Sequence, residues 1–509
     1  MLTGSGKKAA DGADSHASRL SIFLSPIRKS KAFTYLWLGQ WIAMLGSSVS
    51  VLILPLVVYS LTDSSTALGL AMTCYMLPNI IALPFAGWIV DKTDRLRLVM
   101  LSNAARLCIM LLAAISIFNG SLTLERLYIG LVFYGMMEGV FNPAYSALRA
   151  EVFTPDIRNA ANALSQISIQ GVRLLGPALG GMLVTAASPG AGFALDSITY
   201  FISLLCFLML GRVLARQKGR SGGGWRARSD KLGGQAGTQA AQGIAAPRAD
   251  EAANGGAAAN GQGAAGRSET ADAAASLRGG MPAETVVPPG GVAPGDAAAA
   301  APRTPSVLSG FGAEFMEGVH VLRKLPWLWI TILAFSLLNI CYTGIVAVLV
   351  PWLFKVHHGL PPSVYGIAMA GTAVGAILAA VLFGSKRDWQ RRGLVAYGGA
   401  LLGGVALLLL SVITWVPGLV MAMVLEGFGM MMFMIIWEIS LQELVPAESF
   451  GRVASLDMLG SFALLPVGYL IVGHLADTIG GLPTIAIFAS VGIVILLTAL
   501  CSPHIRRFN

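Results

Sequence analysis

Twelve apolar runs, each about as long as a helix that crosses a lipid bilayer, dominate this sequence of 509 residues. A transmembrane helix needs about 20 predominantly apolar residues to cross the hydrocarbon core. The runs are continuously apolar, whereas the strands of a membrane barrel alternate between apolar and polar residues over about ten positions. The sequence therefore predicts an all-α membrane protein with twelve transmembrane helices.

The runs form two groups of six, separated by a long polar stretch. The first group comprises Tyr35–Ser60, Ala67–Val90, Leu98–Phe118, Leu127–Ala147, Ala161–Ala186 and Phe193–Gly211. The second comprises Trp327–Leu353, Val364–Phe383, Leu394–Trp415, Val416–Ile439, Val453–Gly473 and Leu482–Cys501. We therefore predict one six-helix bundle over residues 33–212 and a second over residues 326–503.

The composition excludes several other classes of protein. Hydrophobic residues make up 55% of the chain and charged residues 12%, with a mean hydropathy of +0.69. An average soluble protein carries about 25% charged residues, so an ordinary soluble enzyme and a disordered regulator are both excluded. A disulfide scaffold is excluded too, because all five cysteines lie inside apolar runs and read as small buried hydrophobes: Cys74, Cys108, Cys206, Cys341 and Cys501.

The net charge of +9 is distributed unevenly over the two sides of the membrane. Twelve Lys and Arg residues of the short loops and the C-terminus fall on one side, whereas only Arg126 and Lys355 fall on the other. Cytoplasmic loops carry the excess of Lys and Arg, so we place the tails 1–32 and 504–509 in the cytoplasm of a prokaryotic cell. The basic charge then reflects topology in the cell membrane, and we expect no nucleic-acid partner.

Between the two bundles, residues 213–310 are rich in Ala and Gly with scattered Pro. Such a composition does not bury enough apolar surface to fold, so the segment reads as a flexible cytoplasmic linker. The following segment, 311–325, places Phe311, Phe315 and Val319 at helical spacing among charged residues. It is predicted to form an amphipathic helix along the membrane surface.

The two groups of six helices are related as an internal repeat. Gly69–Met72 aligns with Gly366–Met369, and the same register aligns Gly87 with Gly384, Asp91 with Asp388 and Arg95 with Arg392. After a gap, Glu151 aligns with Glu443. Both halves begin on the same side and have an even number of spans, so the repeats are parallel. That arrangement is typical of secondary transporters that rock two bundles around a central site.

The loop between the second and third spans carries a glycine, an acidic residue four positions later, and then a basic cluster: Gly87, Asp91, Lys92, Arg95 and Arg97. The pattern resembles the loop signature of the major facilitator superfamily, with Asp94 in place of the usual glycine, a variant similar to the branch of enterobactin exporters and macrolide-efflux proteins. The resemblance implies alternating access with this loop as a cytoplasmic gate. From the residues alone, the cluster either latches the two halves or only fixes topology.

The fifth span carries a second motif: Gly176, Pro177, Gly180 and Gly181. It resembles the antiporter motif of the same superfamily, and the resemblance favours export. The proline removes a backbone donor and predicts a kink in the helix. The small residues alternatively serve ordinary close packing between helices.

Ionisable side chains near the middle of a span are costly and usually functional. Glu138 and Glu426, on the fourth helix of each half, are the candidates for proton coupling. Arg106 and Arg173 are the candidates for a counter-charge or a substrate anchor. We expect Arg173 to pair with Glu138, either functionally or as a permanent structural pair. Glu426 has no cationic partner in its own half and is predicted to be the more readily protonated acid.

These features predict a secondary active transporter: a monomer that exports small amphipathic molecules, of drug or siderophore type, in exchange for protons. A proton-coupled uptake symporter is the alternative within the same class. A sensor or enzyme embedded in the membrane without transport is the alternative from another class. No HExxH or CxxC pattern occurs, and Gly4–Lys7 lacks the spacing of a phosphate-binding loop. We therefore expect no enzymatic activity, no cofactor and no metal site.

Overall fold

Every regular element is a helix in the part of the chain that the computed structural model describes, which is residues 25–240, 322–383, 391–445, 453, 456–457 and 460–506. Side chains are described within these ranges except at Pro84, Asp91 and 218–240. The first half contains α2 (Ser25–Lys29), α3 (Lys31–Leu61), α4 (Ser65–Lys92), α5 (Arg95–Phe118), α6 (Leu124–Val152), α7 (Arg158–Ala186) and α8 (Pro189–Ala240).

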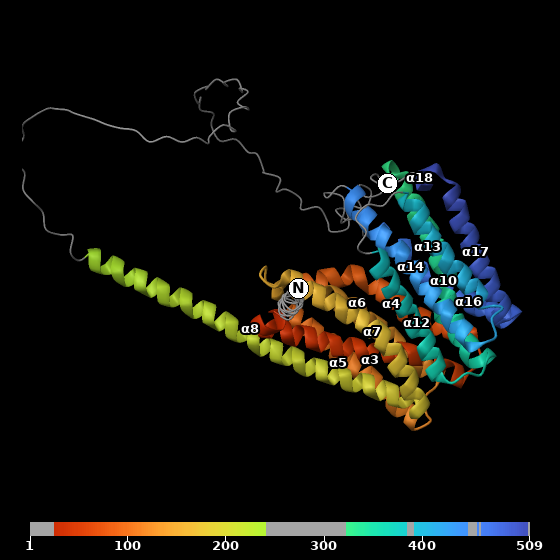
Figure 1. Cartoon of the computed structure of the whole chain (residues 1–509). Helices are drawn as coiled ribbons and strands as arrows, with labels where there is room; N and C mark the ends of the chain where they lie inside the picture. The colour runs from red at the N-terminus through yellow and green to blue at the C-terminus, as the bar shows by residue number, and fades with distance from the viewer. Residues whose placement is uncertain are drawn as a thin grey trace, which may run out of the picture. The chain divides into compact units, whose positions relative to one another are not determined.

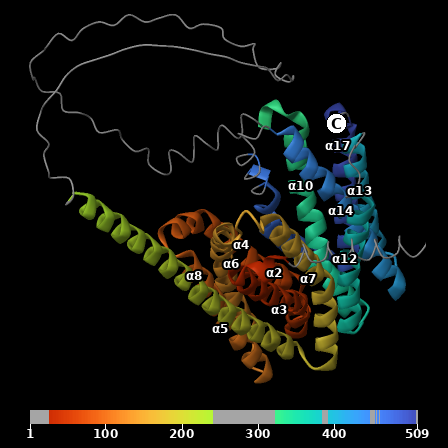
Figure 2. The ribbon, with the colours of Figure 1, turned by 60° about the vertical axis from the view of Figure 1, so that its left-hand side comes forward.

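The second half contains α10 (Pro326–Gly344), α11 (Val350–Trp352), α12 (Pro362–Phe383), α13 (Arg392–Leu409), α14 (Val416–Leu444), α16 (Leu465–Ile479), α17 (Gly481–Cys501) and α18 (Pro503–Arg506). Two π-helical segments, η1 (Ile345–Leu349) and η2 (Leu353–His357), flank α11. In Figures 1 and 2 the helices of the first half, red to yellow, lie beside those of the second half, green to blue.

Eleven helices of the described residues have the length and apolar composition of membrane spans. Helix α6 is equally long and packs against α4 and α5. It is less apolar because it carries Glu138 and Asn142 among its central residues. The predicted all-α membrane architecture is confirmed.

Several boundaries differ from the predicted ones. The eleventh span ends at Ile479 rather than Gly473, because Asp477 in its last turn has partners on another helix. Helix α8 continues to Ala240, past the predicted end of the bundle at residue 212. Its last part, residues 221–240, belongs to a unit separate from the bundles.

Two predicted segments lie largely outside the described residues. These are the remainder of the linker, 241–310, and the start of the amphipathic segment, 311–321. Of that amphipathic segment, residues 322–324 are described and are helical.

The seventh span is irregular around Pro351. The chain runs from α10 through η1, α11 and η2, so that a proline sits between two π-helical turns. Proline has no N–H to donate, and π-bulges accommodate such interruptions of the hydrogen-bond ladder. The carbonyl of Val348 in η1 accepts a hydrogen bond from the Tyr59 hydroxyl of the first half at 3.0 Å.

The two ion pairs of the described residues are equivalent under the internal repeat. Arg95 at the start of α5 lies 3.7 Å from Glu151 at the end of α6, and Arg392 of α13 lies 2.6 Å from Glu443 of α14. The sequence alignment matched these same arginines and glutamates with each other. Exposed pairs contribute about 1 kcal/mol or less to stability. The equivalent positions of the two ion pairs show that the two halves share one internal geometry.

The halves meet where α4 crosses α16 and where α7 crosses α12. A Cβ atom added to Gly69 would overlap the carbonyl oxygen of Tyr469, and one added to Gly366 would overlap that of Pro177. Gly69 and Gly366 are equivalent in the repeat, so the two crossings are equivalent too. Glycine at these positions lets two backbones approach more closely than any side chain permits.

We expect Gly69→Ala to destabilise the protein, because the new methyl group has no room against the Tyr469 backbone. Overpacking of this kind costs about 1–3 kcal/mol. Gly171→Ala is the control, because a Cβ there meets no atom within 4 Å. Thermal unfolding of the purified variants in detergent measures the difference. Equal melting temperatures for the two variants would contradict a tight crossing.

Candidate functional site

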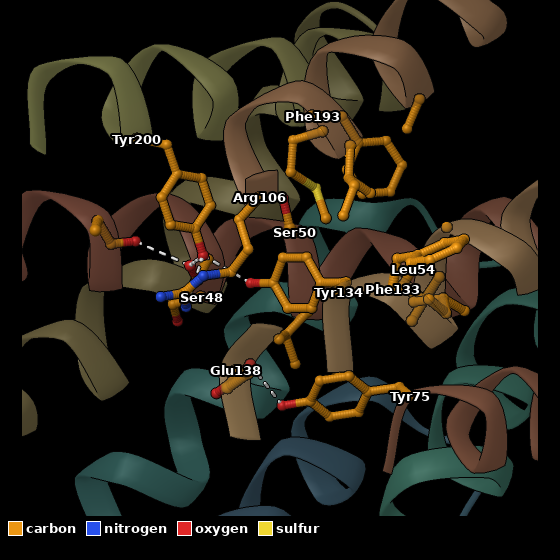
Figure 3. A pocket seen from close by; sticks show the side chains of 18 of the residues that line it. Ser48, Ser50, Leu54, Tyr75, Arg106, Phe133, Tyr134, Glu138, Phe193 and Tyr200 are labelled. Carbon is orange, nitrogen blue, oxygen red and sulfur yellow. Dashed lines mark hydrogen bonds between the residues drawn. The ribbon is translucent and has the colours of Figure 1, made fainter. Parts of the chain in front are cut away.

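A cavity of about 720 Å³ lies among helices α3–α8 of the first half, and all of its lining residues fall between Gln40 and Tyr200 (Figure 3). Its wall is mostly apolar and aromatic. The charged lining side chains are those of Arg106, Arg126, Glu138 and Arg173. Cavities of this size, apolar with a few polar groups, are typical ligand sites. Among the described residues no cluster of three or more His, Cys, Asp or Glu side chains suits a metal ion.

Tyr200 on α8 is the centre of a hydrogen-bond network in the cavity wall. Its hydroxyl lies 2.8 Å from the hydroxyl groups of Tyr134 and Ser47. It also accepts a hydrogen bond from Nη1 of Arg106 at 3.4 Å. Nη2 of Arg106 donates to Oδ1 of Asn103 at 2.8 Å. One network therefore ties together four helices, namely α3, α5, α6 and α8.

The guanidinium of Arg106 is enclosed by aromatic rings. Its Cζ lies 4.1 Å from the ring centroid of Phe141, 5.1 Å from that of Tyr200 and 6.0 Å from that of Tyr134. The residue is only 6% exposed, and its Nε has no hydrogen-bond partner. Neither ion pair of the described residues involves Arg106, and the groups in direct contact with its guanidinium are aromatic rings and neutral hydrogen-bond partners.

Glu138 is bound by a tyrosine, which corrects the predicted pairing with Arg173. The hydroxyl of Tyr75 on α4 donates to Oε2 of Glu138 at 3.0 Å (Figure 3). The described residues contain no ion pair between Glu138 and Arg173. The sequence places the two residues at similar depths in the membrane, because each lies near the middle of its span. Depth alone does not determine which faces of two helices meet. Both residues nevertheless line the same cavity.

Glu426 lies in the second half and does not line this cavity. It is 8% exposed on α14, and its Oε2 has no hydrogen-bond partner. Under the register that aligns Glu151 with Glu443, Glu426 corresponds to Tyr134 and not to Glu138. The same packing recurs around both positions, because Gly135 faces the Tyr75 carbonyl and Gly427 faces the Thr372 carbonyl. The two candidate acids are therefore in different environments.

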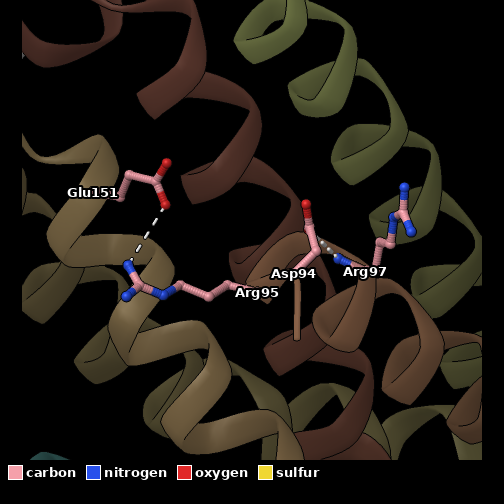
Figure 4. A network of polar contacts seen from close by, with 4 residues as sticks. All are labelled: Asp94, Arg95, Arg97 and Glu151. Carbon is pink, nitrogen blue, oxygen red and sulfur yellow. Dashed lines mark hydrogen bonds and ion pairs between the residues drawn. The ribbon is translucent and has the colours of Figure 1, made fainter. Parts of the chain in front are cut away.

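The contacts described for the Gly87 loop stay within the first half (Figure 4). Asp94 caps α5 by accepting a hydrogen bond from the backbone N–H of Arg97 at 3.0 Å. Arg95 pairs with Glu151, and Nζ of Lys92 lies 4.3 Å from the ring centroid of Trp88. The side chain of Asp91, proposed as a latch, lies outside the described residues.

The glycines of the Gly176–Gly181 motif face neighbouring helices on two sides of α7. A Cβ on Gly176 would overlap Ser48 of α3, and one on Gly180 would lie 3.1 Å from Leu52 of the same helix. A Cβ on Gly181 would lie 2.6 Å from the carbonyl oxygen of Pro362 in the second half. The motif therefore serves close packing, both inside the first bundle and between the two halves.

Hydrogen bonds between the halves gather at the end of α4 that is far from the basic Lys92 loop. Asp477 on α16 accepts from the Ser64 hydroxyl at 2.6 Å and from the backbone N–H groups of Ser65 and Thr66 at 2.7 and 2.9 Å. A carboxylate is favourable at a helix N-terminus because it satisfies free N–H groups and faces the positive end of the helix dipole.

The repeat supplies a second, uncharged version of this cap. Thr185 Oγ1 on α7 accepts from the backbone N–H of Ser363 on α12 at 2.9 Å. Thr185 and Ser363 align with Asp477 and Thr66, respectively, in the registers defined above. Each half therefore caps a helix of the other half at equivalent positions, once with a carboxylate and once with a hydroxyl group.

Sequence reasoning missed Tyr75, Tyr200 and Asp477. The tyrosines gave no signal, because a tyrosine in an apolar run resembles any other buried aromatic residue. For Asp477 a signal existed, since an acid in the last turn of a span is unfavourable beside its own helix C-terminus and needs an external partner. Ser64 before an apolar run likewise marks a helix start.

The Major Facilitator Superfamily model matches residues 36–468. An uncharacterised MFS-type transporter, YfiS, of Bacillus subtilis (strain 168) is 29% identical over 192 residues, which cover 38% of this chain and 45% of the relative. Multidrug resistance protein 1 of the same organism is 25% identical over 185 residues, 36% of this chain and 46% of the relative. The staphyloferrin A transporter of Staphylococcus aureus (strain NCTC 8325 / PS 47) is 24% identical over 180 residues, 34% and 43% respectively.

These matches span less than half the length of the curated relatives. A solved structure of the peptide transporter POT in complex with sulfate is similar over 94% of this chain and 95% of that chain. Its TM-score is 0.60 at 14% sequence identity, so the likeness concerns the fold alone.

We expect Tyr200→Phe to destabilise the protein by about 1–3 kcal/mol, because it leaves the buried groups around Arg106 without a shared acceptor. Tyr397→Phe in the second half is the control, since it removes a single hydrogen bond, to Thr331. Chemical or thermal unfolding of the purified variants measures the two losses. A loss at Tyr200 no larger than that at Tyr397 would contradict a central role for its hydroxyl.

Proposed function

Because the chain belongs to the major facilitator superfamily, which is not an enzyme class, we propose that it is a secondary active transporter that exports small amphipathic molecules in exchange for protons. The observation that carries the proposal is the cavity of about 720 Å³, which combines an apolar, aromatic wall with Arg106, Glu138 and Arg173. Ionisable groups at membrane depth mark substrate and proton pathways.

Export rests on three further observations. The Gly176–Gly181 motif resembles that of antiporters, and one relative is named a multidrug resistance protein. The resemblance of the Gly87 loop to the enterobactin-exporter and macrolide-efflux branch favours the same direction. The alternative within the class is uptake. The name of the staphyloferrin A transporter states no direction of transport and is compatible with it.

In the proposed orientation, the basic loops and both termini face the cytoplasm of a cell membrane. The caps at Asp477 and Thr185 then close the outer side. Nζ of Lys355 reinforces this closure by donating to the carbonyl oxygen of Leu56 at 2.6 Å. Alternating access requires these contacts between the halves to break when the outer side opens.

The test of function is transport in inverted membrane vesicles with an imposed pH gradient, across a panel of amphipathic compounds. Accumulation that depends on the gradient supports proton-coupled export. Accumulation only in right-side-out vesicles would replace export by uptake, and movement of no compound in either orientation would reject transport.

We expect Glu426→Gln to uncouple transport from the pH gradient while leaving the fold intact. A buried carboxyl group without a partner is costly when ionised, and Gln mimics its protonated form. Glu138→Gln is the matched comparison, because Tyr75 holds Glu138 by a hydrogen bond. The measurement is the initial transport rate as a function of external pH for each variant. An unchanged pH profile for Glu426→Gln would show that the proton binds at another residue.

We expect Asp477→Ala to favour opening of the outer side, because it removes all three acceptor contacts at the start of α4. The site is exposed, so the effect is about 1 kcal/mol, or about fivefold in the ratio of the two states. Thr185→Val removes one neutral hydrogen bond and serves as the weaker comparison.

Spin labels on the loops around residues 121 and 411, in a background without native cysteines, report the outer distance in both cap variants. A distance distribution for Asp477→Ala that matches the parent protein would contradict a closing role for this cap.

A further inference from the structure

The cavity of the first half carries an excess of positive charge. Its described lining includes three arginines, Arg106, Arg126 and Arg173, and a single acid, Glu138. The ion pairs of the described residues are the two between Arg95 and Glu151 and between Arg392 and Glu443. No arginine of the cavity therefore has a carboxylate within ion-pair distance in the described part of the chain.

Nearby acids do not cancel this charge. Glu138 already accepts a hydrogen bond from Tyr75. Asp196 on α8 is fully buried and does not line the cavity, and its Oδ1 accepts from Thr199 at 3.3 Å. Even with both acids ionised, three cations face two anions. Of the three, only Arg106 is buried, whereas Arg126 and Arg173 are exposed side chains of the cavity lining, so their positive field is available to an anion that enters the cavity.

The three arginines differ in how free they are to bind a ligand. Both Nη atoms of Arg106 already donate, to Tyr200 and Asn103. Nη1 of Arg126 donates to the carbonyl oxygen of Ser121 at 2.6 Å. Arg173 is exposed, and no hydrogen bond or ion pair of its guanidinium is present among the described residues. Arg173 is therefore the arginine with a complete set of free donors.

We propose that the molecule bound in this cavity is an amphipathic organic anion whose carboxylate is held by Arg173. This inference rests on the proposed function, because it takes the cavity as the substrate site, and it deepens that function by naming the substrate class. Guanidinium donors match the two oxygens of a carboxylate. The apolar body of the ligand lies against the aromatic and aliphatic wall, while Arg106 strengthens the positive field without direct contact.

A matched pair of fluorescent probes tests the charge preference. Dansylglycine carries a carboxylate, and dansylglycine amide has the same ring system without the charge. Fluorescence anisotropy with the full-length protein in phosphatidylcholine nanodiscs gives both affinities. We expect the carboxylate probe to bind at least about tenfold more tightly, the effect of one charge-assisted hydrogen bond. Equal affinities, or preference for the amide, would overturn the proposal.

Three variants locate the contact. Arg173→Gln is expected to weaken dansylglycine binding by about tenfold or more while leaving the amide within about twofold. Arg173→Lys keeps the charge and is expected to retain most of the binding, which also guards against a folding defect. Arg158→Gln makes the same charge change on the same helix outside the cavity lining and is expected to change neither affinity. Equal losses for both probes in Arg173→Gln would overturn a carboxylate contact.

Two further measurements distinguish this proposal from binding of a lipid head group and from the proposed transport function. If phosphatidylglycerol in the nanodisc displaces dansylglycine and vesicles transport no carboxylate, the anion is a lipid head group and the proposal fails. Carboxylate-selective binding without any transport would reject the proposed function and leave the anion preference standing. Transport of the amide as fast as dansylglycine would reject the anion preference and leave transport standing.

Discussion

Direct backbone contact between helices of opposite halves is the constraint on which the rest of this structure depends. Gly69 faces the Tyr469 carbonyl at one crossing, and Gly366 faces the Pro177 carbonyl at the other. Because glycine removes the side chain, helix ends come close enough for Asp477 to reach the backbone N–H groups at the start of α4. A bulkier residue at either crossing would separate the groups that form the caps, and the closed end of the molecule would lose its hydrogen bonds.

The sequence was sufficient for the architecture and for the repeat, because bilayer thickness sets helix length and duplicated halves keep duplicated residues. The alignment of Arg95 with Arg392 and of Glu151 with Glu443 also placed at equivalent positions the residues that form the two ion pairs, although it did not predict the pairs themselves. Side-chain partners inside the membrane were harder to predict. Position along a helix gives depth, but the contact of Glu138 with Tyr75 rather than Arg173 depends on how α4, α6 and α7 are rotated about their axes.

The halves share a backbone plan and differ in chemistry. In the first half, Tyr134, Arg106 and Tyr200 form a connected polar network beside a cavity. At the position equivalent to Tyr134, the second half places Glu426, buried with an unpartnered oxygen. The first half thus combines polar side chains with a cavity, whereas Glu426 of the second half is buried and does not line that cavity. A division between ligand binding and proton binding fits this asymmetry.

The two caps between the halves are equivalent in position and unequal in strength. One has three hydrogen bonds to a carboxylate, and the other a single bond to a hydroxyl group. A force that pulls the halves apart therefore meets more resistance at the α4–α16 crossing than at the α7–α12 crossing. Rigid bodies joined by a strong and a weak attachment rotate about the strong one. In the proposed opening of the outer side, the single bond at the α7–α12 crossing is therefore the first to break, and the gap between the halves is wider beside α7 than beside α4.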